Sequence, residues 1–516
     1  MPRYLIKDYK KLDSIFYKIL LDKKATSVTY CISILQFIKP HTEYFIKYKY
    51  FIKNDFYMIF IFITFFDFSF RIIKWGIRKL EDFYLGLLYK KTNNLDKNKT
   101  DIIFVTSLVN ANTLKSRKNI NNDFIFGNMI YDLRNKYNAK VFYINNTTFN
   151  SRNIFEKLKK NKNIYILKKI ISISEEISIL LLQFSELKNL ILNFFIKKIT
   201  LCNFFLIANN LFSYETRNNI RLKIQLEELI KIYSPKITVV SFEGHCWEKI
   251  AFNVCNSIDD KSIKTVAYQH GGIINNQFSI NRRYKKNYNP DYILTSGKIN
   301  LSFFSKFFLK KDNRLFEIGS NRSSFFNVID IEKKFLDNSK RMNNCLVIPE
   351  GTNEETRILF DFSYILAQNN PKINFILRAH PQININKFVK RFYIFNRYKF
   401  LNNIIISEKP FEIDLRRSQI LLYRGSTGVV TSVLNGLIPV YYRQPNDDIN
   451  SDPIFKLKKL KVVISDKKNF NNILNTENFK KNDEIKLAIK FCNSYFTNQK
   501  RKRTQSIFNI ISNSSK

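Results

Sequence analysis

The segment LLYRGSTGVVTSVLNGLIPV (Leu421–Val440) decides the fold, because two apolar runs flank a glycine turn and a short helical stretch. Gly425, Gly428 and Gly436 fall within it, although the whole chain of 516 residues has 12 glycines. An apolar run, a tight turn, a helix and a second apolar run are typical of a parallel β-α-β unit. The segment therefore predicts an α/β fold built on a parallel sheet.

The same alternation continues toward the N-terminus in two blocks. The block that begins near residue 340 contains the predicted strands NCLVIPEG, INFILRAHP, NNIIISE, QILLYRG and IPVYYR, with helices between them. The earlier block contains the predicted strands DIIFVTSL, AKVFYINN, NIYILKK, PKITVVSFEG, KTVAYQHGG, PDYILTSG and RLFEIGS, and long helices over 171–232. Several of these strands end at a glycine. We expect two Rossmann-like domains in tandem, with ligands bound at the carboxyl ends of the strands.

The domain organisation follows from changes in composition along the chain. Residues 1–95 form a helical, basic and aromatic segment, which the polar stretch 90–100 separates from the rest. We expect one Rossmann-like domain over 96–325 and a second over 326–475. Residues 476–516 are predicted to form a helical tail, with an amphipathic helix over 483–496.

The charge balance indicates an anionic partner. The chain has 85 basic and 43 acidic residues, a net charge of +42. A membrane surface or a phosphorylated substrate is favoured over nucleic acid, because the lysines are dispersed and the sequence has no nucleic-acid-binding motif. Six scattered cysteines without a CxxC pair indicate reduced thiols, and the charged N-terminus does not resemble a signal peptide. Both features predict a cytoplasmic protein.

The most apolar run of the sequence is FYMIFIFITFFDFSF (56–70). Asp67 interrupts it well before the roughly 20 residues that a spanning helix needs. The run is typical of a buried helix, or of an interfacial helix, since basic residues flank it on both sides. We expect residues 45–90 to attach the protein peripherally to the anionic inner face of the membrane.

Rare residues gather at the ends of the predicted strands. Nine of the twelve glycines lie between Gly244 and Gly436, where His270 stands in YQHGG and His380 in RAHPQ. Glycine at a strand end allows a sharp turn or a close approach of the backbone to a ligand. Because the carboxyl ends of parallel strands meet at one edge, these loops are predicted to form one site.

The turn after QILLYRG is the candidate phosphate-binding loop. Gly425 allows close approach, and the hydroxyls of Ser426 and Thr427 can cap the next helix or bind a phosphate. Arg424 and Arg378 are cations near these loops. The loop matches neither a Walker A motif nor the dinucleotide fingerprint. An ordinary helix cap would explain each residue singly but not their company with the two histidine motifs.

The remaining candidates follow other strands. His380 can donate to a phosphate oxygen, whereas His270, whose imidazole titrates near neutrality, suits a general base. Glu243, beside Gly244, is a second candidate base. Glu350 and Gly351 can cap a helix or hold a ribose hydroxyl. Near Glu243, SFEGHCWEK continues into a helix with Trp247 inward and with His245 and Glu248 expected at the surface.

No metal site is predicted. The histidines lie far apart in the sequence and no DxD motif occurs. Cationic side chains and helix ends are therefore expected to offset phosphate charge without a divalent ion.

The set YQHGG, PEG, RAHP and YRGSTGVVTSVLNGLIPVYY resembles inverting glycosyltransferases of the two-Rossmann GT-B fold, which build bacterial surface carbohydrate. It is also similar to sialyl- and polysialyltransferases, and to the CDP-glycerol glycerophosphotransferases of teichoic acid synthesis. The resemblance covers about residues 235–455. It implies an acceptor domain at 96–325, a donor domain at 326–475, and a nucleotide sugar as co-substrate with no other cofactor.

The resemblance also implies roles for single residues. His380, Ser426 and Thr427 would bind the donor phosphates, the Glu350–Gly351 turn would lie beside the nucleotide, and His270 would face the acceptor. The two adjacent acids that precede a glycine in sialyltransferases are absent, and Glu243–Gly244 approximates them. The base therefore stays open between His270 and Glu243.

These observations predict a metal-independent, inverting glycosyltransferase. It would move a sugar from a nucleotide-activated donor, CMP-linked or other, to a glycan or lipid-linked acceptor of capsule, lipopolysaccharide or O-antigen synthesis. The alternative is a nucleotide-sugar 2-epimerase of the same fold. A nucleic-acid-binding protein is a weaker alternative, because it explains the charge but not the histidine motifs.

Overall fold

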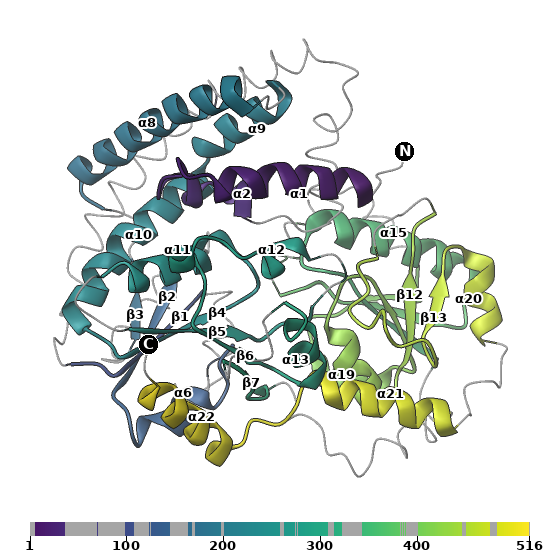
Figure 1. Cartoon of the computed structure of the whole chain (residues 1–516). Coiled ribbons are helices and arrows are strands. Elements are labelled where there is room, and N and C mark those ends of the chain that lie inside the picture. The colour runs from purple at the N-terminus through teal and green to yellow at the C-terminus, as the bar shows by residue number, and fades with distance from the viewer. Residues whose placement is uncertain are drawn as a thin grey trace.

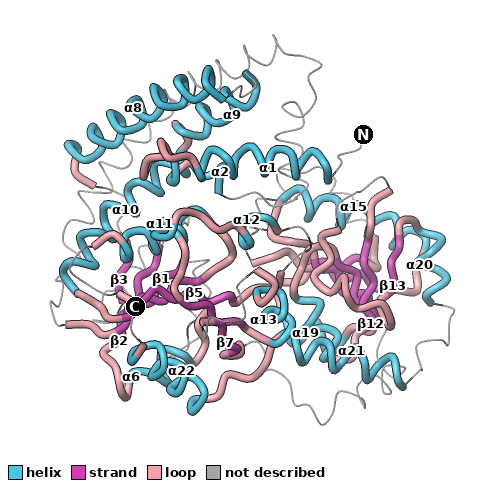
Figure 2. The backbone as a smooth tube through the Cα atoms, in the orientation of Figure 1, coloured by secondary structure: helices cyan, strands magenta, loops and turns pink. Residues whose placement is uncertain are grey.

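Two parallel sheets organise the chain, and helices cover both faces of each (Figure 1). The computed structural model describes residues 6–36, 70, 99–107, 123, 125–144, 164–167, 171–197, 201–258, 263–273, 275, 277–307, 314–321, 343–381, 383, 385, 388, 401–445, 450–474 and 482–514. Figure 2 shows the strands of the two sheets in separate groups, with loops between them.

The first sheet has seven strands in the order β3-β2-β1-β4-β5-β6-β7. They are β1 (Ile102–Ser107), β2 (Ala139–Ile144), β3 (Ile164–Ile166), β4 (Ile237–Ser241), β5 (Lys264–Gln269), β6 (Tyr292–Thr295) and β7 (Leu315–Glu317). Every neighbouring pair is parallel. The first six strands follow the Rossmann order, and all seven were predicted from the sequence.

The second sheet has six strands in the order β10-β9-β8-β11-β12-β13, which is the same Rossmann order. They are β8 (Asn344–Ile348), β9 (Asn374–Leu377), β10 (Ile404–Ile406), β11 (Ile420–Tyr423), β12 (Ile438–Tyr442) and β13 (Val462–Ile464). The sequence predicted all but β13. Two Rossmann-like domains in one chain are the arrangement of the GT-B fold, so the predicted fold class is confirmed.

Residue alternation explains why both faces of each sheet are covered. In β1, Ile103 and Val105 belong to the core on one face, whereas Ile102 and Phe104 belong to the core on the other. In β11, odd-numbered and even-numbered residues divide in the same way. Successive side chains of a strand point to opposite faces, so continuous apolar runs produce strands buried on both sides.

Helices and 3-10 turns fill the layers on both sheets. In the first domain these are α6 (Met129–Arg134), α8 (Ile173–Lys197), α9 (Leu201–Leu211), α10 (Tyr214–Tyr233), α11 (Cys246–Asn256), α12 (Phe278–Asn281), η3 (Lys286–Tyr288) and α13 (Lys298–Phe304). In the second they are α15 (Asn353–Asn369), α18 (Phe411–Arg417), α19 (Gly428–Leu434) and α20 (Lys467–Leu474). Ser213 caps α10 by accepting from the Thr216 N–H.

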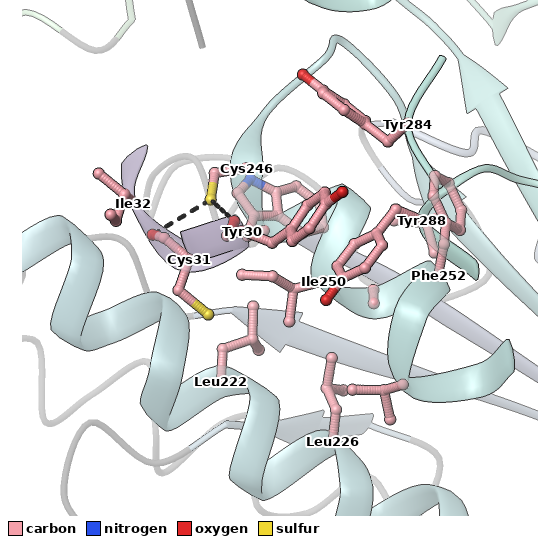
Figure 3. Close-up of a cluster of buried hydrophobic side chains, with 14 of the residues drawn as sticks. Tyr30, Cys31, Ile32, Leu222, Leu226, Cys246, Ile250, Phe252, Tyr284 and Tyr288 are labelled. Atoms are coloured by element: carbon pink, nitrogen blue, oxygen red, sulfur yellow. Dashed lines mark hydrogen bonds between the residues drawn. The ribbon is translucent and has the colours of Figure 1, made fainter. Parts of the chain in front are cut away.

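The N-terminal segment is part of the first domain's packing. Its described elements are α1 (Ile6–Leu21), η1 (Thr29–Cys31) and α2 (Ser33–Gln36). Figure 3 shows Tyr30 and Cys31 among side chains of α10 and α11. The Cys246 Sγ, at the start of α11, donates to the Tyr30 carbonyl at 3.1 Å. Residues 37–69 and 71–98, which hold most of the predicted membrane-binding stretch, lie outside the described residues.

The C-terminal residues divide between the two domains. Helix α21 (Asn482–Tyr495) packs on α19 of the second domain, as Cys492 and Tyr495 share a core with Val430. Helix α22 (Arg501–Asn513) packs beside α6 of the first domain (Figure 1). Phe508 is fully buried there, in the core beneath β1. The last helix of the predicted tail thus contributes to the core of the first domain.

Candidate functional site

The carboxyl ends of the strands converge on the region between the two sheets. In each sheet, strand order reverses at one position, between β1 and β4 in the first and between β8 and β11 in the second. Ligands of open α/β sheets bind outside the carboxyl ends at such a reversal. Glu243 follows β4, Glu350 follows β8, and Gly425 follows β11. Three of the predicted site loops therefore lie at the reversal points.

The Glu243 carboxylate lies between two imidazoles. Its Oε1 is 3.4 Å from His270 Nε2, and its Oε2 is 3.5 Å from His245 Nε2. The His270 side chain is 12% exposed and that of Glu243 33% exposed, so the pair borders solvent without being fully hydrated. The two residues predicted as alternative bases thus lie in contact with each other. His245, which the sequence placed at the surface, is the third member of this group.

A buried carboxylate holds the loop after β4 in shape. Glu248 accepts the backbone N–H groups of Glu243, Gly244 and His245 at 2.9, 2.7 and 2.8 Å. The expectation of a surface position for Glu248 is wrong, since its side chain is 1% exposed. Burial raises the pKa of the Glu248 carboxyl to about 7, against the opposing effect of the nearby His245. The buried Glu248 therefore fixes the backbone of the loop that carries Glu243.

The two glycines after His270 permit close approach on both sides of the turn. A Cβ on Gly271 would stand 2.5 Å from Glu243 Oε1. A Cβ on Gly272 would stand 2.5 Å from Thr427 Cγ2 and 2.6 Å from Tyr495 Oη. Real carbon atoms do not approach so closely, so neither position accepts a side chain without a shift. The contact of Gly272 with Thr427 joins the His270 turn of the first domain to the predicted phosphate loop of the second.

The loops after β8 and β11 also touch each other. Gly425 has a φ of +68°, in the left-handed region that glycine adopts readily. A Cβ there would stand 2.8 Å from the Glu350 Cβ, so the turn packs directly on Glu350. Ser426 Oγ accepts from the Gly428 N–H at 3.4 Å, and Thr427 is the N-cap residue of α19. The predicted turn and helix are confirmed at this segment.

Arg424 does not lie on the surface of this loop. Its side chain is 1% exposed, and its guanidinium forms an ion pair with Glu355, which is 2% exposed. It also donates to the Tyr442 carbonyl at 3.4 Å. The expected contact of Arg424 with a donor phosphate is therefore not what the structure shows. The sequence did not predict the pairing of Arg424 with Glu355, which lies 69 positions away and whose backbone N–H donates to the side chain of the helix cap Thr352.

Arg378 also has a structural partner. Its Nη1 donates to Asp414 Oδ2 at 2.8 Å and to the Lys409 carbonyl, and its guanidinium lies over the Phe411 ring at 5.3 Å. Asp414 is fully buried and also pairs with Arg417. Because the buried carboxylate needs cations, Arg378 fixes α18 against the end of β9. This role differs from the predicted phosphate contact.

His380 lies at the same sheet edge as the other second-domain residues. It follows β9, which pairs with β8, the strand that precedes Glu350 and Gly351. The residue is half-buried, and its carbonyl accepts the Ile383 N–H at 2.8 Å, which closes a turn around Pro381. Its place one strand from Glu350 is that expected of a residue facing the site. Within the described ranges no group of three His, Cys, Asp or Glu side chains could hold a metal ion.

Comparisons with known proteins give a likeness to solved structures. No protein-family model and no curated protein matches the chain. The UDP-GlcNAc 2-epimerase of Methanocaldococcus jannaschii, in complex with UDP-GlcNAc and UDP, is 13% identical, with 80% of this chain and 100% of that chain covered at a TM-score of 0.47. A glycosyltransferase from Rickettsia africae is 14% identical, with coverages of 81% and 100% and a TM-score of 0.42. The UDP-GlcNAc 2-epimerase of Neisseria meningitidis, bound to UDP-GlcNAc, is 12% identical, with coverages of 79% and 98% and a TM-score of 0.45.

Identities and TM-scores at this level carry no argument about activity. The assignment of the fold rests on the two Rossmann strand orders and their parallel registers.

Proposed function

We propose that the chain is a glycosyltransferase that binds a nucleotide-activated sugar between its two Rossmann-like domains. The observation that carries this proposal is the contact of Gly272 with Thr427. Glu243 and His270, which we propose act as an acid–base pair, precede this contact and would lie beside the glycine turn at the reversal point of the second sheet. A titratable pair next to a polar loop at such a crevice is the arrangement expected of a catalytic site.

The second domain is proposed to hold the donor. The Glu350–Gly351 turn and the loop from Gly425 to Thr427 lie at the reversal of strand order, and His380 is one strand away. Hydroxyls, backbone N–H groups and an imidazole are donors suited to phosphate oxygens. With Arg424 and Arg378 engaged inside the domain, these groups are the direct phosphate contacts in our proposal.

The first domain is proposed to activate the acceptor. The acceptor hydroxyl gives its proton to the Glu243–His270 pair as its oxygen forms a bond to the anomeric carbon. The bond from that carbon to the phosphate oxygen breaks at the same time, and the nucleotide leaves with the electron pair. A single displacement of this kind inverts the anomeric configuration. One member of the pair accepts the proton, and the other holds that residue in the orientation needed to accept it, as in other paired bases.

Nucleotide binding is the first test. Calorimetry of the full chain with CMP, CDP, UDP and GDP should show one of them binding clearly more tightly than the others. If none binds, the proposal is wrong at its first step. The preferred nucleotide also identifies the donor class, CMP-linked or other.

Substitutions at the pair test the catalytic step. His270→Ala and Glu243→Gln should each lower turnover by about a hundredfold or more while nucleotide affinity stays near wild type. His245→Ala is the matched control, because His245 touches the same carboxylate from the more exposed side. If only one of the first two variants loses turnover, that residue is the base. Wild-type turnover in both would remove the pair from the mechanism.

An epimerase is the second candidate, favoured by the same pair. A carboxylate in contact with two imidazoles can remove a proton from a sugar carbon and return one. Incubation of the preferred nucleotide sugar without acceptor separates the candidates. Epimerised nucleotide sugar would indicate the epimerase, whereas an unchanged donor that reacts only with a glycan acceptor would support transfer.

We infer an acceptor of surface-glycan synthesis at the cytoplasmic face of the membrane, from the resemblance of the motifs.

A further inference from the structure

Helix α8 exposes an apolar face. Eight of its large apolar side chains are at least 40% exposed: Ile177, Leu181, Leu182, Phe184, Ile191, Leu192, Phe195 and Ile196. Phe195 reaches 74% and Leu181 64%. Of the 19 exposed large apolar side chains in the described parts of the chain, these eight belong to one helix. So large a patch on a single element marks a binding surface rather than ordinary exposure.

Four polar side chains of α8, those of Glu176, Gln183, Glu186 and Asn193, are buried against the protein. Glu176 forms a salt bridge with Arg221 of α10 at 2.6 Å, and both are buried. Glu186 accepts from the hydroxyls of Thr26, at 2.7 Å, and Thr29. Gln183 donates to the Leu211 carbonyl at the end of α9. Buried polar contacts, together with Ile179 and Leu190 in the core of the first domain, thus attach α8 to the protein, while eight other large apolar side chains are left outside.

We propose that α8 is an interfacial helix, whose apolar face enters the headgroup and acyl boundary of an anionic membrane. Charge favours this partner. Lys188 is exposed on the helix, and in the sequence Lys168 and Lys169 precede the helix while Lys197 and Lys198 follow Ile196, in a chain of net charge +42. Apolar insertion combined with lysine attraction to anionic lipid is the usual basis of such binding. The Glu175 carboxylate, in the first turn of the helix, accepts the backbone N–H of Ser172 at 2.7 Å.

The helix lies in the plane of the membrane rather than across it. Ser174–Ile196 is long and apolar enough to span a bilayer by length and composition, with a mean hydropathy of 1.4, and 28% of that window is buried. A spanning position would remove Glu176, Gln183 and Glu186 from their protein partners and place them in hydrocarbon, which is costly. In Figure 1, α8 and α9 form the outermost of the described layers at the top, beyond α1 and α2.

This surface differs from the one expected from the sequence. Residues 45–90 lie outside the described part except Phe70, so the earlier expectation is untested. The two surfaces are separable by experiment, and the inference for α8 does not depend on the proposed reaction.

Vesicle flotation tests the proposal. The full chain should float with vesicles of phosphatidylcholine containing phosphatidylglycerol, and a fraction should stay bound at high salt, where charge attraction is screened. The double variant Leu181→Gln, Phe195→Gln should lower the partition coefficient by at least about tenfold, because two large apolar groups no longer insert. The matched control is Ile365→Gln, Leu487→Gln, which changes two exposed apolar residues of α15 and α21. It should bind as wild type does.

A second measurement keeps the test informative if the glutamine variant folds poorly. An environment-sensitive fluorophore on Leu181→Cys should shift to the blue with anionic vesicles, and one on Leu487→Cys should not. Absence of wild-type binding, or binding that high salt abolishes and the α8 variant does not change, would overturn the proposal. Self-association without lipid that the same variant abolishes would also overturn it, since the face would then serve a second copy.

Discussion

A methyl group added at Gly272 should separate the two domains at the proposed site. In Gly272→Ala the new carbon would stand 2.5 Å from Thr427 Cγ2 and 2.6 Å from Tyr495 Oη. Ordinary carbon contacts lie at about 3.5–4.0 Å, so one loop must retreat by roughly 1 Å. Overpacking of this size costs about 1–3 kcal/mol of stability. A misplacement of about 1 Å can lower catalysis by roughly a hundredfold.

The assay compares unfolding free energy, nucleotide affinity and turnover in one set of variants. Thr427→Ser removes Cγ2 and keeps the hydroxyl, so it should restore part of what Gly272→Ala loses. The coupling in a double-mutant cycle measures that contact directly. Gly428→Ala is the control from the same loop, because its Cβ would meet side-chain atoms of Ile348, Ser426 and Phe411 no closer than 3.1 Å.

Two results would refute this reasoning. Wild-type stability and turnover in Gly272→Ala would mean that the two loops do not touch in solution. Strictly additive effects of Gly272→Ala and Thr427→Ser would mean that the new methyl group does not contact the Thr427 methyl group.

Three further substitutions test individual side chains. Glu248→Gln should remove a pH dependence of stability. Burial raises the pKa of the Glu248 carboxyl from 4.5 to about 7, so the folded state retains its proton between these pH values. The wild-type unfolding free energy should therefore fall by up to about 3 kcal/mol relative to the variant as pH rises across that window. Parallel curves in denaturant titrations at pH 5 and pH 7.5 would contradict this. Arg424→Met should cost about 3–5 kcal/mol by leaving Glu355 buried without its cation, and adding Glu355→Leu should recover most of it; a loss of nucleotide affinity at unchanged stability would instead return Arg424 to the phosphate site. His380→Ala should weaken nucleotide binding by about 1.5–3 kcal/mol in calorimetry, and unchanged affinity would exclude His380 from the donor site.

The strands could be predicted from the sequence because a parallel strand buried on both faces is a continuous apolar run. β11 and β12 show this most clearly, since glycine turns bound the short helix between them. β13 was missed because Val462 is only partly buried, Val463 is exposed and lysines precede them. The edge strand lacks the long apolar run that marks a central one.

The candidate site was predicted in part. Parallel topology was enough to expect that Glu243, His270, Glu350 and Thr427 lie at strand ends. The contact of Glu243 with His270 was not predictable, because no sequence rule gives distances between separate loops. For Glu248 a signal was present: an acid at the third helical position after an N-cap residue accepts the orphan N–H groups of the turn.

The sequence alone gives neither the partner of a charged side chain nor what covers an apolar one. Arg424 stands next to a glycine turn, but only the fold shows that its side chain turns inward to Glu355. The apolar residues of α8 are typical of a buried face, yet Leu181 and Phe195 are exposed. Hydrophobic periodicity locates a face of a helix but does not identify what covers it.

The return of α22 to the first domain has a consequence for synthesis of the chain. Phe508 and Ile511 complete a core whose other members include residues of β1, β2, β4, β5, β6 and α6. The described part of that core otherwise ends at Ile318, so nearly 200 more residues must be translated before α22 exists. At about 5–20 residues per second this takes roughly 10–40 s. During that interval the ribosome-bound first domain lacks α22 and exposes the apolar surface that α22 later covers. A chaperone that binds exposed apolar surface would protect the nascent chain in that state.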